Sequence, residues 1–167
     1  MKILVDIRHL ANPHQSGVGQ YTTELLRALF EIDHENEYVL FSSGRVMPDL
    51  RPYNLKPTTC SHIHLSTPNK ILNLRTLLFG HPTINWHIRE SIDLVFLPNL
   101  NITTLPKDIP TVLTLHDLSW KLYPEFYSLK MRAWHKATRA DELISQSRAI
   151  ITPSRSTAQD AQRLFGV

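Results

Sequence analysis

Short apolar runs recur along the chain at spacings typical of a parallel β-sheet. They are rich in branched residues, end at turn-forming residues and cover 3–7, 38–41, 94–97, 112–115 and 149–151. Between several of them lie helical patterns, such as 21–32, in which Tyr21, Leu25, Leu29 and Ile32 share one face. This alternation predicts a single α/β domain over 1–167, with a Rossmann-like, doubly wound, mainly parallel sheet and helices on both faces.

The remaining segments are predicted from weaker patterns. Residues 62–65 are compatible with a further strand, 70–79 and 83–91 with two short helices, and 46–59 with a proline-rich connection. A longer helix is expected over 127–147, with Met131, Trp134 and Ile144 packing inward. Ser154 or Ser156 is expected to cap the last helix.

Two glycines lie where the first strand gives way to the first helix, in Ser16-Gly17-Val18-Gly19-Gln20. A loop without side-chain bulk exposes backbone N–H groups at a helix N-terminus, which favours an anion such as phosphate. The same residues suit a tight turn that binds nothing, so both interpretations stay open. Thr22 stands where a dinucleotide-binding fingerprint has its third glycine, which disfavours a nicotinamide-dependent dehydrogenase.

A second polar pair, His116-Asp117, directly follows the apolar run that ends at 115. Ligands of open α/β sheets lie beyond the carboxyl ends of the strands, so this pair should face the same crevice as Gly17. Asp117 would hold the imidazole of His116 in one tautomer, leaving its other nitrogen for a substrate hydroxyl. The alternative is that both residues only cap a strand end and the following turn.

Composition narrows the classes of function. The 167 residues are 42% hydrophobic and 20% charged, and the net charge of +3 is too small to indicate a nucleic-acid partner. Cys60 is the single cysteine, no apolar run approaches the roughly 20 residues of a membrane span, and the N-terminus is too charged for a signal peptide. We therefore expect a cytoplasmic location and leave open peripheral contact with the inner membrane face.

Two further clusters of residues bear on metal binding and on lipid binding. The chain contains no Asp-x-Asp pair, and Cys60, His62 and His64 are more typical of solvated strand-edge residues than of a metal site, so no metal is expected. The segment 126–140 carries Lys130, Arg132, Lys136 and Arg139, with Trp134 among them and no acidic residue. A solvated helix face is favoured, and contact with anionic lipid is the alternative.

Three motifs in this order resemble the N-terminal domain of GT-B retaining glycosyltransferases of group 1, family four. They are Gly17-Val18-Gly19-Gln20-Tyr21, His116-Asp117-Leu118 and Ile151-Thr152-Pro153-Ser154, and the resemblance covers essentially the whole chain. It implies transfer of a sugar from a nucleotide-diphosphate donor to the hydroxyl of a saccharide or lipid-linked acceptor. The missing Asp-x-Asp pair favours transfer that is independent of a metal. No cofactor is implied beyond the nucleotide sugar itself.

The resemblance also implies roles for individual residues. Backbone amides of Gly17, Val18 and Gly19 would face the donor diphosphate and the acceptor. His116 would contact the transferred sugar with Asp117 orienting it, and these two are the candidate catalytic residues. Asn99 and Ser154 would line the cleft.

Part of the family pattern has no counterpart in the chain. Two glutamates eight positions apart, which the family's C-terminal domain uses to grip the donor, cannot be placed, because no glutamate lies eight residues after another. We therefore expect the acceptor-side half of an enzyme, which needs a donor-binding domain in cis or in trans and is inactive alone. Two other interpretations remain: a non-catalytic subunit that recruits acceptor or membrane for a separate catalytic chain, and a nucleotide-binding oxidoreductase domain.

Overall fold

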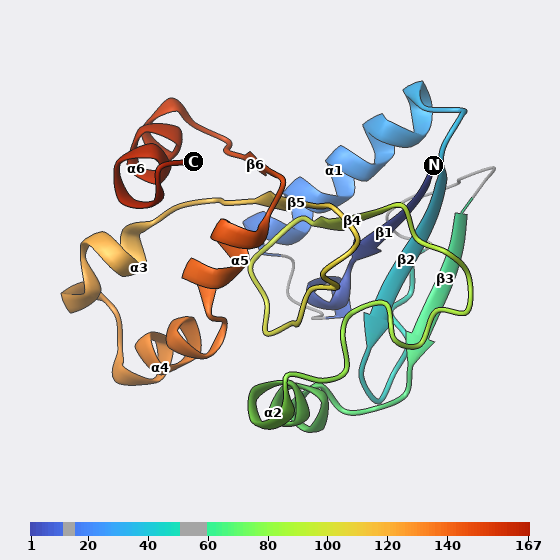
Figure 1. Cartoon of the computed structure of the whole chain (residues 1–167), viewed down its shortest axis with the longest axis horizontal. Coiled ribbons are helices and arrows are strands. Elements are labelled where there is room, and N and C mark those ends of the chain that lie inside the picture. Colours follow the sequence, from blue (N-terminus) through green and yellow to red (C-terminus); the bar gives the residue numbers. More distant parts are fainter. Residues whose placement is uncertain (12–15, 51–59) are drawn as a thin grey trace.

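The computed structural model describes residues 1–11, 16–50 and 60–167 and contains one six-stranded, all-parallel sheet (Figure 1). Its spatial order is β3-β2-β1-β4-β5-β6. The strands are β1 (Lys2–Asp6), β2 (Glu37–Ser43), β3 (Cys60–Leu65), β4 (Leu94–Leu97), β5 (Thr111–Thr114) and β6 (Ala149–Ile151). All five predicted strands and the strand suggested at 62–65 are confirmed, and the order is that of a doubly wound fold.

Helices cover both faces of this sheet. Successive strand residues point to opposite faces, so Val5 packs with Leu26 of α1, while Leu4 belongs to the cluster of Leu143 from α5. The helical elements are η1 (Arg8–Ala11), α1 (Gly17–Ile32), α2 (Asn69–Phe79), α3 (Ser119–Leu122), η3 (Pro124–Phe126), α4 (Leu129–Ala137), α5 (Ala140–Gln146) and α6 (Arg155–Phe165). None of the helices in the described ranges is long and apolar enough to cross a membrane.

The first helix begins four residues earlier than the sequence pattern indicates. Gly17 is its first residue, and the hydroxyl of Ser16 accepts a hydrogen bond from the N–H of Gly19 as an N-cap. The prediction that the two glycines form a loop ahead of a helix starting at Tyr21 was therefore wrong. The serine cap stabilises the first turn strongly enough to include two residues of low helix propensity.

The face of α1 that packs on the sheet also differs from the predicted one. Thr22, Thr23 and Leu26 are buried, whereas Ile32 is 77% exposed. Both threonine hydroxyls donate to backbone carbonyls one turn earlier, so their burial leaves no unpaired donor. Apolar periodicity alone could not identify that face.

Two other helix predictions need correction. The helix expected over 127–147 is split into α4 and α5 at Arg139, whose φ of 51° is left-handed and ends the helical run. Ile144 is buried as predicted, but Met131 and Trp134 are exposed, so their inward packing was wrong. Residues 83–91 form turns rather than a helix.

The other boundaries agree with expectation. The helix predicted over 70–79 is confirmed as α2, and Ser154 caps α6 by accepting from the N–H of Thr157, while Ser156 lies inside that helix. Residues 46–50 of the predicted connection have no regular structure, and 51–59 lie outside the described residues.

A buried ion pair fixes the carboxyl end of β1. Arg8 Nη2 lies 2.7 Å from Asp6 Oδ2, its Nε donates to the same carboxylate, and both side chains are almost fully buried. Arg8 Nη1 donates to the carbonyl of Ile102 at 3.2 Å, and the guanidinium lies over the ring of Phe41. The pair thus ties β1 to β2 and to the loop that follows β4. Burial alone would raise the pKa of Asp6, but Arg8 outweighs it and holds that pKa below 3.8.

Replacing Arg8 with methionine tests this connection, because it leaves the Asp6 carboxylate buried without a counter-charge. At neutral pH we expect Arg8→Met to lower the free energy of unfolding by about 3–5 kcal/mol. Because the pKa of Asp6 is depressed in the folded state, its ion pair contributes stability above pH 3.8, and this contribution is lost as the pH falls through the lower folded-state pKa. The difference in unfolding free energy between Arg8→Met and the wild type should therefore shrink in acid. Urea denaturation across this pH range measures it. The double variant Asp6→Asn/Arg8→Met is the control, and a deficit equal to that of the single variant would contradict the argument.

Candidate functional site

The candidate site lies where the strand order reverses, between β1 and β4. The chain leaves β1 for β2 on one side and later returns to β4 on the other, and ligands of doubly wound sheets bind in the crevice at this point. A hollow of about 410 Å³ opens here, lined mostly by polar side chains. Its residues come from η1, the start of α1, α2, the loop after β4, and α4: Arg8, His9, Ala11, Ser16, Asn69, Asn73, Asn99, Leu100, Asn101 and Trp134.

His116 follows β5 and is held in one tautomer by the backbone of the neighbouring strand end. Its Nε2 lies 2.9 Å from the carbonyl oxygen of Pro98, and a carbonyl can only accept, so Nε2 carries the proton. In the neutral ring, Nδ1 then keeps its lone pair and is a hydrogen-bond acceptor. The ring also meets Tyr21 edge to face at 4.9 Å, which fixes its plane.

Asp117 does not orient His116. Its carboxylate Oδ1 accepts from the N–H of Ser119 at 2.9 Å and from the hydroxyl of the same residue. The aspartate thus stabilises the turn at the start of α3. The prediction that Asp117 orients His116 was therefore wrong, because the carbonyl of Pro98 makes the contact with the imidazole instead.

The start of α1 presents two free N–H donors, and they belong to Gly17 and Val18 rather than to the two glycines. Ser16 Oγ occupies the N–H of Gly19, whereas the N–H groups of Gly17 and Val18 have no partner among the described residues. Gly17 is exposed with open space around the position of a Cβ, while Gly19 is buried against Leu10 and Ser16. The end of α1 available to an anion therefore consists of the amides of Gly17 and Val18.

His9 is a site residue that the sequence analysis missed. Its Nε2 lies 2.8 Å from Thr22 Oγ1, and the hydroxyl of Thr22 already donates to the carbonyl of Val18, so the imidazole is the donor. Burial lowers the pKa of His9 below 6.5, Asp6 opposes this, and the nearby His116 lowers it further. His9 is therefore neutral at pH 7. The carboxyl-end argument that identified His116 applies equally to His9, which follows β1.

The two residues expected to line the cleft differ in position. Asn99 lines the hollow, together with Asn69 and Asn73 of α2, which the sequence analysis did not identify. Ser154 is not among the lining residues and acts as the cap of α6. Through that cap it approaches His116 indirectly, because Thr157 Oγ1 donates to the carbonyl of His116 at 3.3 Å.

The two histidines of β3 share the hydroxyl of Ser42 as a hydrogen-bond partner. Ser42 Oγ lies 2.7 Å from His62 Nε2 and 2.9 Å from His64 Nδ1, so one buried hydroxyl joins both rings. Burial raises the pKa of Cys60 to about 11, which disfavours the thiolate that a metal requires. No group of three potential ligands gathers anywhere in the ranges that the structure describes.

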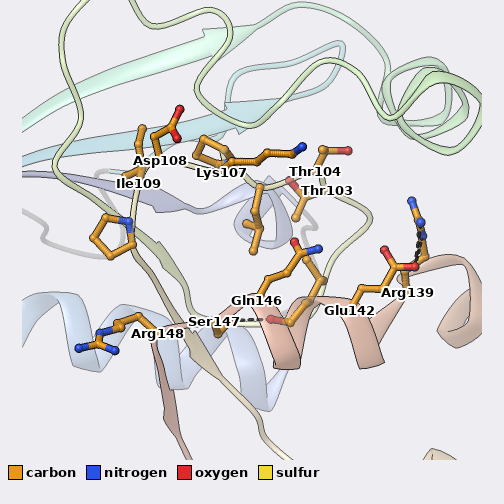
Figure 2. A pocket seen from close by; sticks show the side chains of 14 residues that line it. Thr103, Thr104, Lys107, Asp108, Ile109, Arg139, Glu142, Gln146, Ser147 and Arg148 are labelled. Carbon is orange, nitrogen blue, oxygen red and sulfur yellow. Dashed lines mark hydrogen bonds and ion pairs between the residues drawn. The ribbon is translucent and has the colours of Figure 1, made fainter.

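A larger hollow of about 720 Å³ lies elsewhere, at the amino ends of β5 and β6 (Figure 2). The loop 103–110 forms one side and α5 the other, and Figure 2 shows Arg139 paired with Glu142, at 2.7 Å. This hollow is at the opposite end of the strands from His9, His116 and the start of α1. The smaller hollow lies at the end of the strands where ligands of such sheets bind, and it is therefore the candidate site. Asn99 lines it, whereas His116, Gly17 and Val18 lie outside its lining.

Comparison with known families identifies this chain as similar to a family of glycosyltransferases. A family model described as Glycosyltransferase Family 4 matches residues 15–167, most of the chain. The matched region includes His116, the amides of Gly17 and Val18, and Asn99. A comparison with curated proteins found no match.

The hydrogen-bond chain from His9 through Thr22 to Val18 can be tested by an isosteric substitution. Thr22→Val leaves the buried Nε2 donor of His9 unpaired, and we expect the free energy of unfolding to fall by about 1–3 kcal/mol. Thr22→Ser keeps the hydroxyl and removes one methyl group, so it should cost about 0.8 kcal/mol. Urea denaturation of both variants is the measurement. A valine variant as stable as the wild type would show that the chain is not formed.

Proposed function

The chain belongs to glycosyltransferase family 4, and we propose that its cleft takes part in moving a sugar from a nucleotide-diphosphate donor to an acceptor hydroxyl. The observation that carries this proposal is the contact of His116, whose Nε2 is committed to the carbonyl of Pro98, so that its Nδ1 is the nitrogen left to meet a hydroxyl. The exposed start of α1, with two free amides, supplies the complementary site for phosphate.

The proposed reaction retains the configuration of the anomeric carbon and requires neither a metal nor a protein base. The bond between the anomeric carbon and the phosphate oxygen breaks as the acceptor oxygen bonds to that carbon. The proton of the acceptor hydroxyl passes to the departing phosphate, whose developing charge the amides of Gly17 and Val18 would stabilise. His116 then holds a hydroxyl of the transferred sugar and fixes its orientation.

We infer that the chain forms only one wall of the complete cleft. It would supply the acceptor side, while a donor-binding domain, in cis or in trans, would hold the nucleotide and most of the diphosphate. Only the two free amides at the start of α1 are available to a diphosphate among the described residues of the site. Arg8, which lines the hollow, already donates to Asp6 and to the carbonyl of Ile102. We therefore expect weak donor binding and negligible turnover from the chain alone, and we place this hexosyl transfer in the cytoplasm.

A ligand titration separates this proposal from the oxidoreductase interpretation. Ligand-observed NMR should detect binding of nucleotide-diphosphate sugars such as UDP-glucose and GDP-mannose, and none of NAD. Gly17→Trp places an indole over the free amides and should weaken binding about tenfold or more, the equivalent of roughly 1.4 kcal/mol. Gly17→Ala, which meets only open space, is the matched control and should bind as the wild type does. Binding of NAD at this end of α1 would refute the proposal.

The role of His116 is tested by comparing alanine with asparagine at that position in the enzyme that contains both domains. His116→Ala removes the acceptor atom and should lower kcat about 100-fold, the order expected of a well-placed polar group in a transition state. His116→Asn can place an amide oxygen near the position of Nδ1 and should recover part of this loss. Equal kcat values for the alanine variant and the wild type would contradict the assignment, once circular dichroism shows that both are folded.

A further inference from the structure

Cations gather around a third hollow, of about 430 Å³, which lies between α3, α4 and the start of α5. They come from three parts of the chain: Lys121 from α3, Arg132 and Lys136 from α4, and Arg139 from the position before α5. Figure 1 shows α3 and α4 at the end of the molecule away from β2 and β3. None of the described residues that line this hollow lines the candidate site, so the two hollows are separate.

The spacing of residues along α4 explains why part of its charge faces this hollow. Arg132 and Lys136 are about one helical turn apart, and His135 lies on the same face. All three line the hollow, whereas Lys130 lies on another side of the helix and does not. The basic segment 126–140 is therefore divided between a concave surface and an open one.

Carboxylates balance only half of the positive charge around the hollow. Lys121 Nζ lies 2.6 Å from Asp141 Oδ2, and Arg139 Nη2 lies 2.7 Å from Glu142 Oε1. The two cations of α4 form no ion pair with a described residue. The four cations and two carboxylates that line the hollow thus leave two positive charges uncompensated.

The wall of the hollow also contains hydrogen-bonding nitrogens without partners. Nε1 of Trp120 and Nδ1 of His135 are buried, and neither has a hydrogen-bond partner among the described residues. The two rings stack at 5.1 Å with 7° between their planes. Burial lowers the pKa of His135 below 6.5, and Asp117 opposes this, so the ring is neutral at pH 7 and adds no charge to the hollow. A buried donor without an acceptor is unfavourable, and an acceptor atom of a ligand would remove that cost.

We propose that this hollow binds a small phosphate ester that carries two negative charges. A phosphate ester has this charge near neutral pH and presents three strong acceptor oxygens. The guanidinium of Arg132 can donate to two of these oxygens at once, Lys136 supplies the second charge, and the indole N–H of Trp120 is a donor for the third.

Size and charge distinguish this ligand from other anions. A hollow of about 430 Å³ is in the range of small-molecule sites and has room for a phosphorylated sugar. A carboxylate carries a single charge and would leave one of the two cations of α4 unmatched. The phosphate site does not depend on the proposed function, because the candidate site uses other residues.

Isothermal titration calorimetry of the chain at constant ionic strength tests the proposal. The wild type should bind glucose 6-phosphate and inorganic phosphate, but neither glucose nor chloride. Arg132→Gln and Lys136→Gln should each weaken binding about tenfold, the equivalent of about 1.4 kcal/mol, because each removes a charge-assisted hydrogen bond. Lys130→Gln removes the same charge from another side of α4, so it is the matched control and should bind as the wild type does.

NMR of the ¹⁵N-labelled chain locates the bound phosphate. The chain has three tryptophans, and Trp86→Phe and Trp134→Phe, which alter exposed side chains, assign the indole N–H signals. Addition of inorganic phosphate should move the Trp120 signal downfield, as a new hydrogen bond does, and leave the signals of Trp86 and Trp134 in place.

Three results would overturn the proposal, once circular dichroism shows that the variants are folded. They are a wild type that responds to chloride as it does to phosphate, a Lys130→Gln variant that loses as much affinity as Arg132→Gln, and a Trp120 signal that phosphate does not move. The nucleotide-sugar titration fails or succeeds separately. Gly17→Trp should leave phosphate binding unchanged, and Arg132→Gln should leave binding of UDP-glucose unchanged.

Discussion

The geometry of the site depends on the buried ion pair between Asp6 and Arg8. The buried charges of Asp6 and Arg8 are tolerated because they neutralise each other and because the guanidinium donates both to the carboxylate and to the carbonyl of Ile102. These bonds join the end of β1 to the loop that follows β4, and a crevice opens between these two strands because the strand order reverses there. Because the guanidinium of Arg8 is engaged by the Asp6 carboxylate and the Ile102 carbonyl, the ion pair shapes the hollow and does not offer a free cation to it.

From this anchor the site is extended by backbone carbonyls that act as acceptors. The carbonyl of Pro98 accepts a hydrogen bond from His116, and the carbonyl of Val18 accepts one from the hydroxyl of Thr22, which in turn accepts from His9. In both imidazoles Nε2 is the donor to these oxygens, so Nδ1 is the nitrogen left to face a ligand. Two such nitrogens are compatible with the proposed binding of sugar hydroxyls, which donate hydrogen bonds without requiring a counter-charge. The carboxylate that follows His116 in the sequence, Asp117, stabilises the turn at Ser119.

The sequence predicted the sheet and the location of the site better than the contacts within it. Strand runs such as 94–97 are apolar on both faces, and this pattern is specific to buried parallel strands, so both the sheet and its carboxyl edge followed. The start of α1 was missed because helix propensity penalises glycine locally, whereas the Ser16 cap acts from outside the segment. The partner of His116 was missed because Pro98 is 18 residues away and contributes only a carbonyl, which leaves no mark on side-chain type. The left-handed conformation of Arg139 could not be predicted either, because nothing in an arginine side chain requires it.

The exposed stripe of α2 shows where hydrophobic periodicity stops being informative. A helix with apolar residues at the spacing of Ile71, Leu74 and Leu78 is ordinarily assigned to a core through that face, yet the face that packs is the row of Leu72 and Thr76. Two apolar rows on one short helix exceed what a single sheet edge can cover, and the surplus has to meet something other than water or remain a liability for aggregation. The cations beside that surplus and the asparagines beside the buried row give the helix three distinct sectors.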